Sequence, residues 1–237
     1  SSSPAQTADA DPVAALEKIS AKITRNDQGE VVEVSLHDTK ITDAGLVHLK
    51  GMSKLETLSL SDSNITDAGI VHLKGLTNLQ TLYLTDTKIT DAGLVHLKGL
   101  ANLQTLDLTG IHITDAGIVH LKGLAKLETL NLMSTQITDA GLVHLKGLQL
   151  TTLLIPDRFK TDLGLRHYLA AIRPEKVILS LVDWEITDAG LVHLKGLTNL
   201  QTLILSGSNI TDAGIVHLKG LTNLQTLGLM RAKVTSA

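Results

Sequence analysis

The sequence predicts an α/β solenoid: a right-handed array of stacked repeats with a concave parallel β-sheet and short convex helices. The first observation is the segment ITDAGLVHLKGL at 89–100, whose near-copies lie mostly 24 residues apart and begin at Ile41, Ile65, Ile113, Ile137, Ile186 and Ile210. The second is a motif of the form LxxLxL between the copies, as in LQTLYL at 79–84. A fixed period of this length is typical of solenoids, because each unit buries its apolar side only against its neighbours.

The LxxLxL motif predicts one short strand per repeat. Successive side chains of a strand point to opposite faces, so Leu82 and Leu84 should point inward, and Thr81, Tyr83 and Thr85 outward. Stacked strands form a parallel sheet with about 4.8 Å between neighbours, and wider helices on the other side make the array curve. Outward strand residues therefore form columns on the concave face.

The ITDAGLVHLKGL segment predicts a short helix on the convex side. Thr90 and Asp91 offer oxygens for the N-cap, and the charge of Asp91 complements the positive end of the helix dipole. A helical wheel places Leu94 and Leu97 on the face toward the sheet and Val95 roughly opposite. The equivalent valines then form a convex apolar stripe, which could serve self-association.

On these two motifs the chain resembles the leucine-rich-repeat family. It is most similar to the short bacterial type, rich in ITDAGL and GLTNLQTL, that is abundant in planctomycete-like genomes. The resemblance covers residues 31–234 and implies the curved α/β array described above. It also implies a binding scaffold, and it names no activity.

Three parts of the chain are expected. Solenoid ends expose their core unless something covers them, so an amphipathic N-terminal helix is expected to cap the first repeat. The parts are a flexible linker at 1–10, a capping helix and turn at 11–30, and a leucine-rich-repeat domain at 31–237 with about eight or nine repeats, irregular at 148–185.

Both ends of the repeat array carry interpretable residues. Asp11 can cap a helix and Pro12 suits its first position. The apolar stripe of this helix is predicted to contain Val13, Leu16, Ile19 and Ile23. No capping helix is visible after Val234, so the protein is expected to be a monomer, or a weak homodimer through an open C-terminal end.

The opening residues SSSPAQTADADP are small, polar and proline-bearing. They resemble a linker left after removal of a secretion signal, although an artificial chain start would look the same. We therefore expect an exported protein, located in the periplasm or cell envelope or secreted, rather than a cytoplasmic one.

Composition argues against several classes of function. The formal charge of −3 lacks the excess of Lys and Arg that nucleic acid requires, and no apolar run approaches the roughly 20 residues of a membrane span. The absence of cysteine excludes disulfides and thiol catalysis. No phosphate-binding glycine loop, GxSxG or HExxH motif occurs. We expect no enzyme, no catalytic residue, no cofactor and no metal.

Two columns on the strand side repeat one residue type. The first contains Thr57, Thr81, Thr105, Thr129, Thr152, Thr202 and Thr226. Threonine is favoured in strands, so a structural role is the simpler interpretation of this column. A lattice that binds ice or a mineral is the alternative. The second, just after the strands, contains Asp38, Asp62 and Asp86. Turn capping is the simpler interpretation; a calcium ion or a lysine-bearing partner is the alternative.

The helices repeat a histidine in each unit: His48, His72, His96, His120, His144, His167, His193 and His217. A metal ladder is one interpretation. The motif offers no i,i+4 pair and no carboxylate partner, so a structural role at the helix flank is preferred.

The pattern breaks after Gly147. Residues 148–155 lack one residue relative to GLTNLQTLYL, and the next helix motif, TDLGLRHYL from Thr161, is predicted to run about one turn longer. Lys176 stands where a core leucine is expected. Aromatic residues and arginines concentrate here: Phe159, Tyr168, Trp184, Arg158, Arg166 and Arg173.

Outward positions around this break become apolar, at Met133, Leu154, Ile178, Val182 and Ile204. A contiguous apolar surface usually marks an interface, and aromatic and arginine side chains are common at binding hot spots. The alternative is repair after a deletion, in which Phe159 fills the isoleucine position and Trp184 covers a local gap.

The sequence thus predicts a non-enzymatic scaffold that binds a protein or peptide through its concave face. The predicted contact residues are Tyr83, Asp107, Asn131, Met133, Leu154, Arg158, Ile178, Val182, Trp184 and Ile204. A structural or adhesive spacer of the cell envelope without a discrete site is the alternative. An intracellular adaptor, similar to substrate-recognition subunits of ubiquitin ligases, is a third hypothesis.

Overall fold

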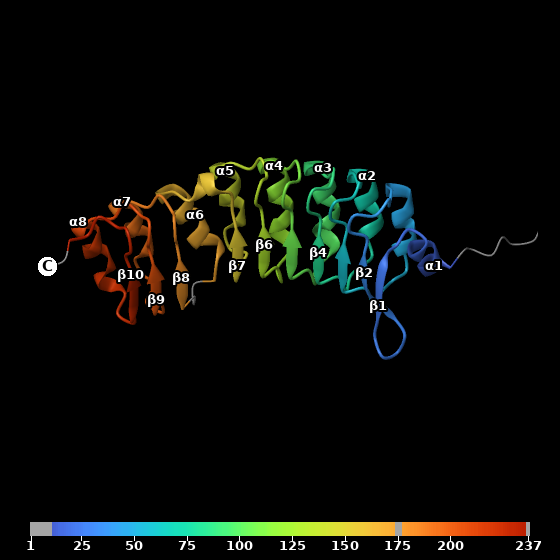
Figure 1. The fold of residues 1–237 in the computed structure, drawn as a ribbon, viewed down its shortest axis with the longest axis horizontal. Helices are drawn as coiled ribbons and strands as arrows, with labels where there is room; N and C mark the ends of the chain where they lie inside the picture. The colour runs from blue at the N-terminus through green and yellow to red at the C-terminus, as the bar shows by residue number, and fades with distance from the viewer. Residues whose placement is uncertain (1–10, 174–176, 236–237) are drawn as a thin grey trace, which may run out of the picture.

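The computed structural model describes residues 11–173 and 177–235. The repeats follow one another along the long axis in sequence order, with the helices along the outer side of a shallow arc and the strands along its inner side (Figure 1). Strands β1–β7 form one sheet and β8–β10 a second one, each in sequence order. The predicted solenoid of parallel strands and short helices is confirmed.

The strands are short and regularly spaced: β1 (Lys22–Arg25), β2 (Val31–Ser35), β3 (Thr57–Ser59), β4 (Thr81–Tyr83), β5 (Thr105–Asp107), β6 (Thr129–Asn131), β7 (Thr152–Leu154), β8 (Ile178–Ser180), β9 (Thr202–Ile204) and β10 (Thr226–Gly228). The α-helices are α1 (Pro12–Glu17), α2 (Asp67–Ile70), α3 (Asp91–Leu94), α4 (Asp115–Ile118), α5 (Asp139–Leu142), α6 (Asp162–Ala171), α7 (Asp188–Leu191) and α8 (Asp212–Ile215). The 3-10 helices are η1 (Asp43–Leu49), η2 (Val71–Leu73), η3 (Val95–Gly99), η4 (Val119–Gly123), η5 (Val143–Leu145), η6 (Asp157–Phe159), η7 (Val192–Leu194) and η8 (Val216–Gly220).

The core is a stack of equivalent leucines. Leu58, Leu82 and Leu106 pair in register across β3, β4 and β5, and all three are fully buried. The helix leucines Leu94 and Leu97 are also fully buried, as the helical wheel predicts. Because each repeat places its leucines at the same positions, the stack continues from one unit to the next.

A polar contact between successive repeats, which we call an Asp–Thr rung, links the helix starts. Asp91 accepts hydrogen bonds from the backbone N of Thr114 (2.8 Å) and from its Oγ1 (2.6 Å). The same Oγ1 accepts from the backbone N of Ala116, and so caps α4. Gly117 leaves room for the aspartate, since a Cβ there would lie 2.3 Å from Asp91 Oδ1.

The ITDAGL motif therefore encodes stacking as well as a helix start. Thr caps its own helix, Asp binds the next repeat, and Gly makes space for the Asp of the previous repeat. Rungs occur at Asp43–Thr66, Asp67–Thr90, Asp91–Thr114, Asp115–Thr138, Asp162–Thr187, Asp188–Thr211 and Asp212–Thr235.

The aspartates just after the strands occupy left-handed turns. Asp38, Asp62 and Asp86 have φ values of 52°, 55° and 51°. Asp and Asn are the non-glycine residues that tolerate this conformation best, and Gly110 takes the same place in the following repeat. The left-handed turn explains why aspartate recurs in this column, whereas turn capping and the alternative of a lysine-bearing partner stay predictions.

The N-terminal cap differs from the prediction. Asp11 caps α1 by accepting from Val13 N (3.0 Å), but the helix ends at Glu17. Ile23, predicted on the helical stripe, lies in β1 and pairs with Val34 of β2 in an antiparallel hairpin. The left-handed turn at Ser20 (φ 68°) reverses the chain before a short run with β-branched residues. A strand as well as a helix therefore covers the first repeat.

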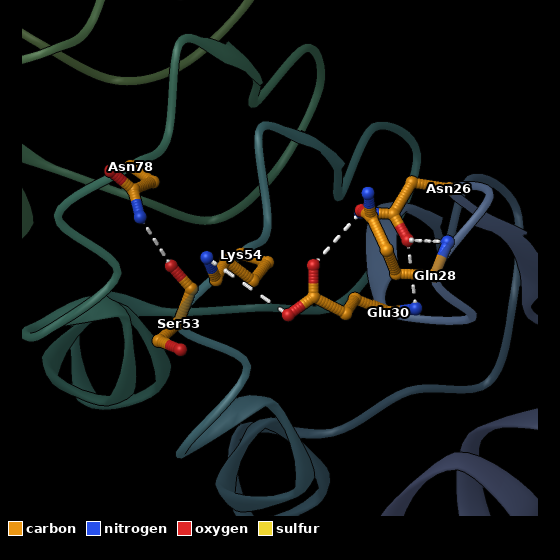
Figure 2. A network of polar contacts seen from close by, with 6 residues as sticks. All are labelled: Asn26, Gln28, Glu30, Ser53, Lys54 and Asn78. Atoms are coloured by element: carbon orange, nitrogen blue, oxygen red, sulfur yellow. Dashed lines mark hydrogen bonds and ion pairs between the residues drawn. The ribbon is translucent and has the colours of Figure 1, made fainter.

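Polar contacts hold this hairpin to the array (Figure 2). Asn26 Oδ1 accepts from the backbone N of Gln28 and of Glu30, and its Nδ2 donates to Glu30 Oε2 (2.9 Å). Glu30 Oε1 lies 3.9 Å from Lys54 Nζ in the next repeat. One repeat further, Asn78 Nδ2 donates to the carbonyl of Ser53 (2.6 Å).

The irregular repeat interrupts both the sheet and the rungs. Helix α6 is a continuous α-helix of ten residues, whereas its neighbours are four-residue α-helices followed by 3-10 helices; the segment is longer than theirs, as predicted, but by less than a full turn. The strand ladders join β7 only to β6 and β8 only to β9 in the described residues. Asp139 Oδ1 is buried without a hydrogen-bond partner, because the missing residue displaces Thr161. Lys176 lies outside the described residues.

We expect the rungs to contribute measurably to stability. Asp91→Ala leaves the Thr114 N–H without its acceptor and should lower the free energy of unfolding by about 1–2 kcal/mol. Asp139→Ala is the matched control, since the equivalent Oδ1 has no partner, and should cost less. Urea denaturation of both variants measures the difference; equal losses would contradict a role for the rung.

The rungs should also make the protein sensitive to acid. The pKa of Asp188 is lowered by hydrogen bonds from the backbone and the side chain of Thr211, and the pKa of Asp212 by those from the side chain and the backbone of Thr235. A carboxylate whose pKa falls on folding contributes stability that is full above its unfolded-state pKa, about 4, and is lost as the pH falls through the folded-state value.

The double variant Asp188→Asn, Asp212→Asn should therefore lose less stability than the unmodified protein between about pH 7 and about pH 3. Chemical denaturation at both pH values measures this difference. Identical pH dependence of the two proteins would refute the assignment.

Candidate functional site

The candidate site lies on the strand side of the array, where outward side chains form the predicted columns. Tyr83, Leu154, Ile178 and Val182 are 38%, 46%, 60% and 43% exposed. Met133 and Ile204 are half-buried. The prediction that Leu154, Ile178 and Val182 face away from the core is confirmed.

We define the apolar patch as Met133, Leu154, Ile178, Val182 and Ile204. Leu154 pairs with Asn131 across β6 and β7. Ile178 pairs with Thr202, and Ser180 with Ile204, across β8 and β9. The patch thus lies on both sides of the interruption between β7 and β8. Val177, 42% exposed and directly before β8, adds apolar surface; it is not among the predicted contact residues, although it begins the apolar run VILSLV.

The polar members of the predicted site lie on the neighbouring strands. Tyr83, Asp107 and Asn131 are consecutive partners across β4, β5 and β6. Asn131 Nδ2 donates to Asp107 Oδ2 (3.1 Å), and Asn131 Oδ1 accepts from Met133 N (3.1 Å). Asp107 Oδ1 accepts from the backbone N and the Oγ1 of Thr109. These contacts hold the two polar side chains in fixed orientations.

Trp184 is wrongly predicted as a contact residue, because its side chain is only 6% exposed. Its ring packs edge-to-face against Tyr168, with centroids 5.3 Å apart. It stands where regular repeats carry a buried hydroxyl, such as Thr87, which donates to Leu84 O (2.8 Å). Alignment with that inward position was the signal that the prediction missed.

Arg158 occupies the same position of its own repeat. It is exposed, but its Nη2 donates to the carbonyls of Thr135 (2.7 Å) and Ile137 (2.8 Å) in the preceding repeat. Its guanidinium also lies 4.5 Å from the ring centroid of Phe159, which is buried. The guanidinium thus already serves a structural link, so we assign it no partner contact.

The three rings of the irregular repeat therefore fill its interior, as the repair interpretation supposed. Phe159, Tyr168 and Trp184 are all buried. Burial of Tyr168 raises the pKa of its phenol. What the break exposes is aliphatic: Leu154, Ile178 and Val182.

The remaining surface offers little that resembles a small-molecule or metal site. Over residues 11–173 and 177–235, no group of three or more His, Asp or Glu side chains is placed to hold a metal ion. The convex valines are exposed as predicted.

Two hollows of about 260 Å³ flank the irregular repeat. One is lined by residues that include Glu128 and Arg173, and the other by residues that include Lys146, Arg166 and His167. Neither includes the apolar patch. No described helix has the length and apolar character required to cross a bilayer.

Comparisons with known proteins agree with the architecture. Residues 30–89 and 53–113 match a family model described as leucine rich repeat, and residues 123–146 and 196–218 match a second model with the same description. A search of curated proteins finds no match.

Three solved structures are similar to the chain. Internalin C2 from Listeria monocytogenes is 26% identical, with a TM-score of 0.56, over 95% of this chain and 93% of that one. Another internalin of that organism, inlF, is 18% identical, with a TM-score of 0.40, over 95% and 89%. The ectodomain of a plant receptor kinase from Arabidopsis thaliana is 18% identical, with a TM-score of 0.44, over 90% and 26%.

The burial of Trp184 has a direct consequence for stability. Trp184→Ala should lower the free energy of unfolding by about 3–5 kcal/mol, because it leaves a cavity beside Tyr168. Tyr83→Ala, which removes the exposed concave ring, should change it by no more than about 0.5 kcal/mol. Urea denaturation compares the two; a small loss for Trp184→Ala would mean that the ring is not part of the core.

Proposed function

Because the chain belongs to the leucine-rich-repeat family, whose members are typically protein-interaction scaffolds, we propose that it is a non-enzymatic scaffold that binds a protein or peptide on the strand side of its array. The observation that carries the proposal is the exposure of Leu154, Ile178 and Val182. Apolar side chains gathered on one face of a protein usually mark an interaction site.

The regular repeats supply a rigid frame for such a site. The rungs and the leucine stack hold each strand in a fixed register, so a partner meets side chains whose positions are already set. Little conformational entropy is then lost on binding, which favours affinity. Asp107 and Asn131 are held by hydrogen bonds to each other and to nearby backbone, and they extend the surface toward β4.

A spacer without a discrete site is the alternative function. A spacer needs no apolar side chains on its open sheet face, and serine or threonine at these positions, as in the regular repeats, would keep it soluble. The apolar patch therefore favours the binding scaffold. Export stays a prediction, and fractionation of the producing cells would test it.

The scaffold proposal predicts a separation between binding and stability. The triple variant Leu154→Ser, Ile178→Ser, Val182→Ser should leave the melting temperature nearly unchanged, since all three side chains face solvent, and should abolish retention of the partner. The matched control changes three comparably exposed convex valines, Val71, Val95 and Val119, to serine and should retain the partner.

The measurement is an affinity pull-down from extracts of the cells that produce the protein, with stoichiometry determined by quantitative mass spectrometry. Recovery of one stoichiometric protein by the unmodified chain and the convex variant, but not by the concave variant, is the expected result. Equal recovery by all three proteins would place binding elsewhere, and no recovery by any of them would favour the spacer.

A further inference from the structure

The two sides of the array differ in charge, although the whole chain is close to neutral. Each repeat presents five positions on the strand side, which in the repeat of β4 are Gln80, Thr81, Tyr83, Thr85 and Asp86. Over the nine repeats, nine of these positions are acidic and one is basic, whereas the chain contains 24 acidic residues and 21 Lys and Arg. The acidic ones are Glu33, Asp38, Glu56, Asp62, Asp86, Asp107, Glu128, Asp157 and Asp183, and the basic one is Arg231.

Part of this negative charge has a partner within the chain. Asp157 pairs with Lys160 (2.7 Å), Glu128 with Arg173 (3.0 Å), and Asp62 lies 3.2 Å from His37 Nδ1. Within the described residues, Asp86 and Asp107 have no Lys, Arg or His nitrogen within 4.0 Å. No ion pair therefore neutralises either carboxylate, although Asp107 accepts hydrogen bonds from Thr109 and Asn131.

Asp86 and Asp107 converge on one short segment. Asp107 Oδ1 accepts from the backbone N (2.8 Å) and Oγ1 (2.6 Å) of Thr109. Asp86 Oδ1 lies over the next residue, since a Cβ added to Gly110 would be 2.0 Å from it. Tyr83 pairs with Asp107 across β4 and β5, and Tyr83 is 38% exposed. Two carboxylates beside an exposed aromatic ring suit a cationic side chain, through charge attraction and cation–π contact.

The carboxylates of Asp86 and Asp107 belong to strands and turns close to the apolar patch. Asp107 is in β5 and Leu154 in β7, two strands away in a ladder without interruption. Neighbouring strands are about 4.8 Å apart, so the two residues are separated by about 10 Å. An extended peptide rises about 3.3 Å per residue, so about three residues span this distance.

We propose that the partner of the concave face is an extended segment with a lysine or arginine about three residues from its apolar anchors. The cation lies between Asp86 and Asp107 against Tyr83, and the apolar side chains cover Leu154, Ile178 and Val182. This inference rests on the proposed function and adds the charge of the partner to it. The acidic face repels nucleic acid and anionic lipid surfaces, which leaves a basic peptide segment as the occupant.

The test uses three synthetic peptides of equal length with identical leucine positions, whose remaining residues are Lys, Ser or Glu. Fluorescence anisotropy with the full chain measures their affinity at about 50 mM and about 300 mM NaCl. We expect the Lys peptide to bind about tenfold or more tightly than the Glu peptide at low salt, with a smaller advantage at high salt because exposed charges are screened.

Variants separate the contribution of charge from that of the apolar patch. Asp86→Asn with Asp107→Asn should weaken the Lys peptide about tenfold and leave the Ser peptide unchanged. The matched control, Glu17→Gln with Asp27→Asn, removes two exposed charges, one in α1 and one in the turn between β1 and β2, and should change neither affinity. The Leu154, Ile178, Val182 triple serine variant should weaken all three peptides.

If the three peptides bind equally and only the triple serine variant weakens them, the scaffold proposal stands and the preference for a cation is overturned. If the Glu17, Asp27 variant weakens the Lys peptide as much as the Asp86, Asp107 variant does, the attraction is a general effect of net charge and the assigned site is wrong. Failure of the Lys peptide to bind also overturns the inference.

Discussion

The structure depends on one polar constraint, the Asp–Thr rung between successive helix starts. Burial of leucine is strong but not directional, and a stack of identical side chains does not by itself select one register. Asp91 selects one register, because both its carboxylate oxygens accept hydrogen bonds from Thr114 and because Gly117 is the position at which a carboxylate fits. A shift by one residue would bring a side chain with a Cβ into that space. The rung therefore converts general apolar attraction into a fixed repeat.

One junction of the chain lacks the rung, and the repeat that follows it is the irregular one. One missing residue before Thr161 leaves Asp139 Oδ1 buried without a partner, although β6 and β7 of that junction still pair. The strand ladder is interrupted one junction later, between β7 and β8, where the Asp162–Thr187 rung is kept. The gap is filled by larger side chains: Phe159, Tyr168 and Trp184. Arg158 replaces a small hydroxyl and donates to two carbonyls of the preceding repeat. The apolar patch lies around this junction, so the least regular part of the array is also the part that is most unlike its neighbours chemically.

Repetition explains which features the sequence could predict. Leucine positions, short helices and exposed valines recur in every unit, so each assignment is supported by several copies. Features that occur once were predicted less well. Ile23 continues an apolar helical stripe in the sequence but lies in β1, because the turn at Ser20 precedes it. Trp184 was judged by its residue type, although its place in the repeat is an inward one. The excess of acidic residues on the strand side was not predicted, because the net charge of the whole chain averages over the strand side and the helix side.

Exposed apolar surface alone cannot distinguish the two sides of this array. Val95 and its equivalents are about as exposed as Leu154 and Val182. Their surroundings differ: Val95 precedes Lys98 by three residues in η3, and side chains three residues apart in a 3-10 helix lie one above the other, so a cation adjoins Val95, as it does the equivalent valines of η4 and η8. Leu154 instead adjoins Asn131, which is fixed by Asp107. A partner that binds the strand side gains from ordered groups of one charge, and specificity depends on such groups because they reject partners of the wrong charge as well as attracting the right one.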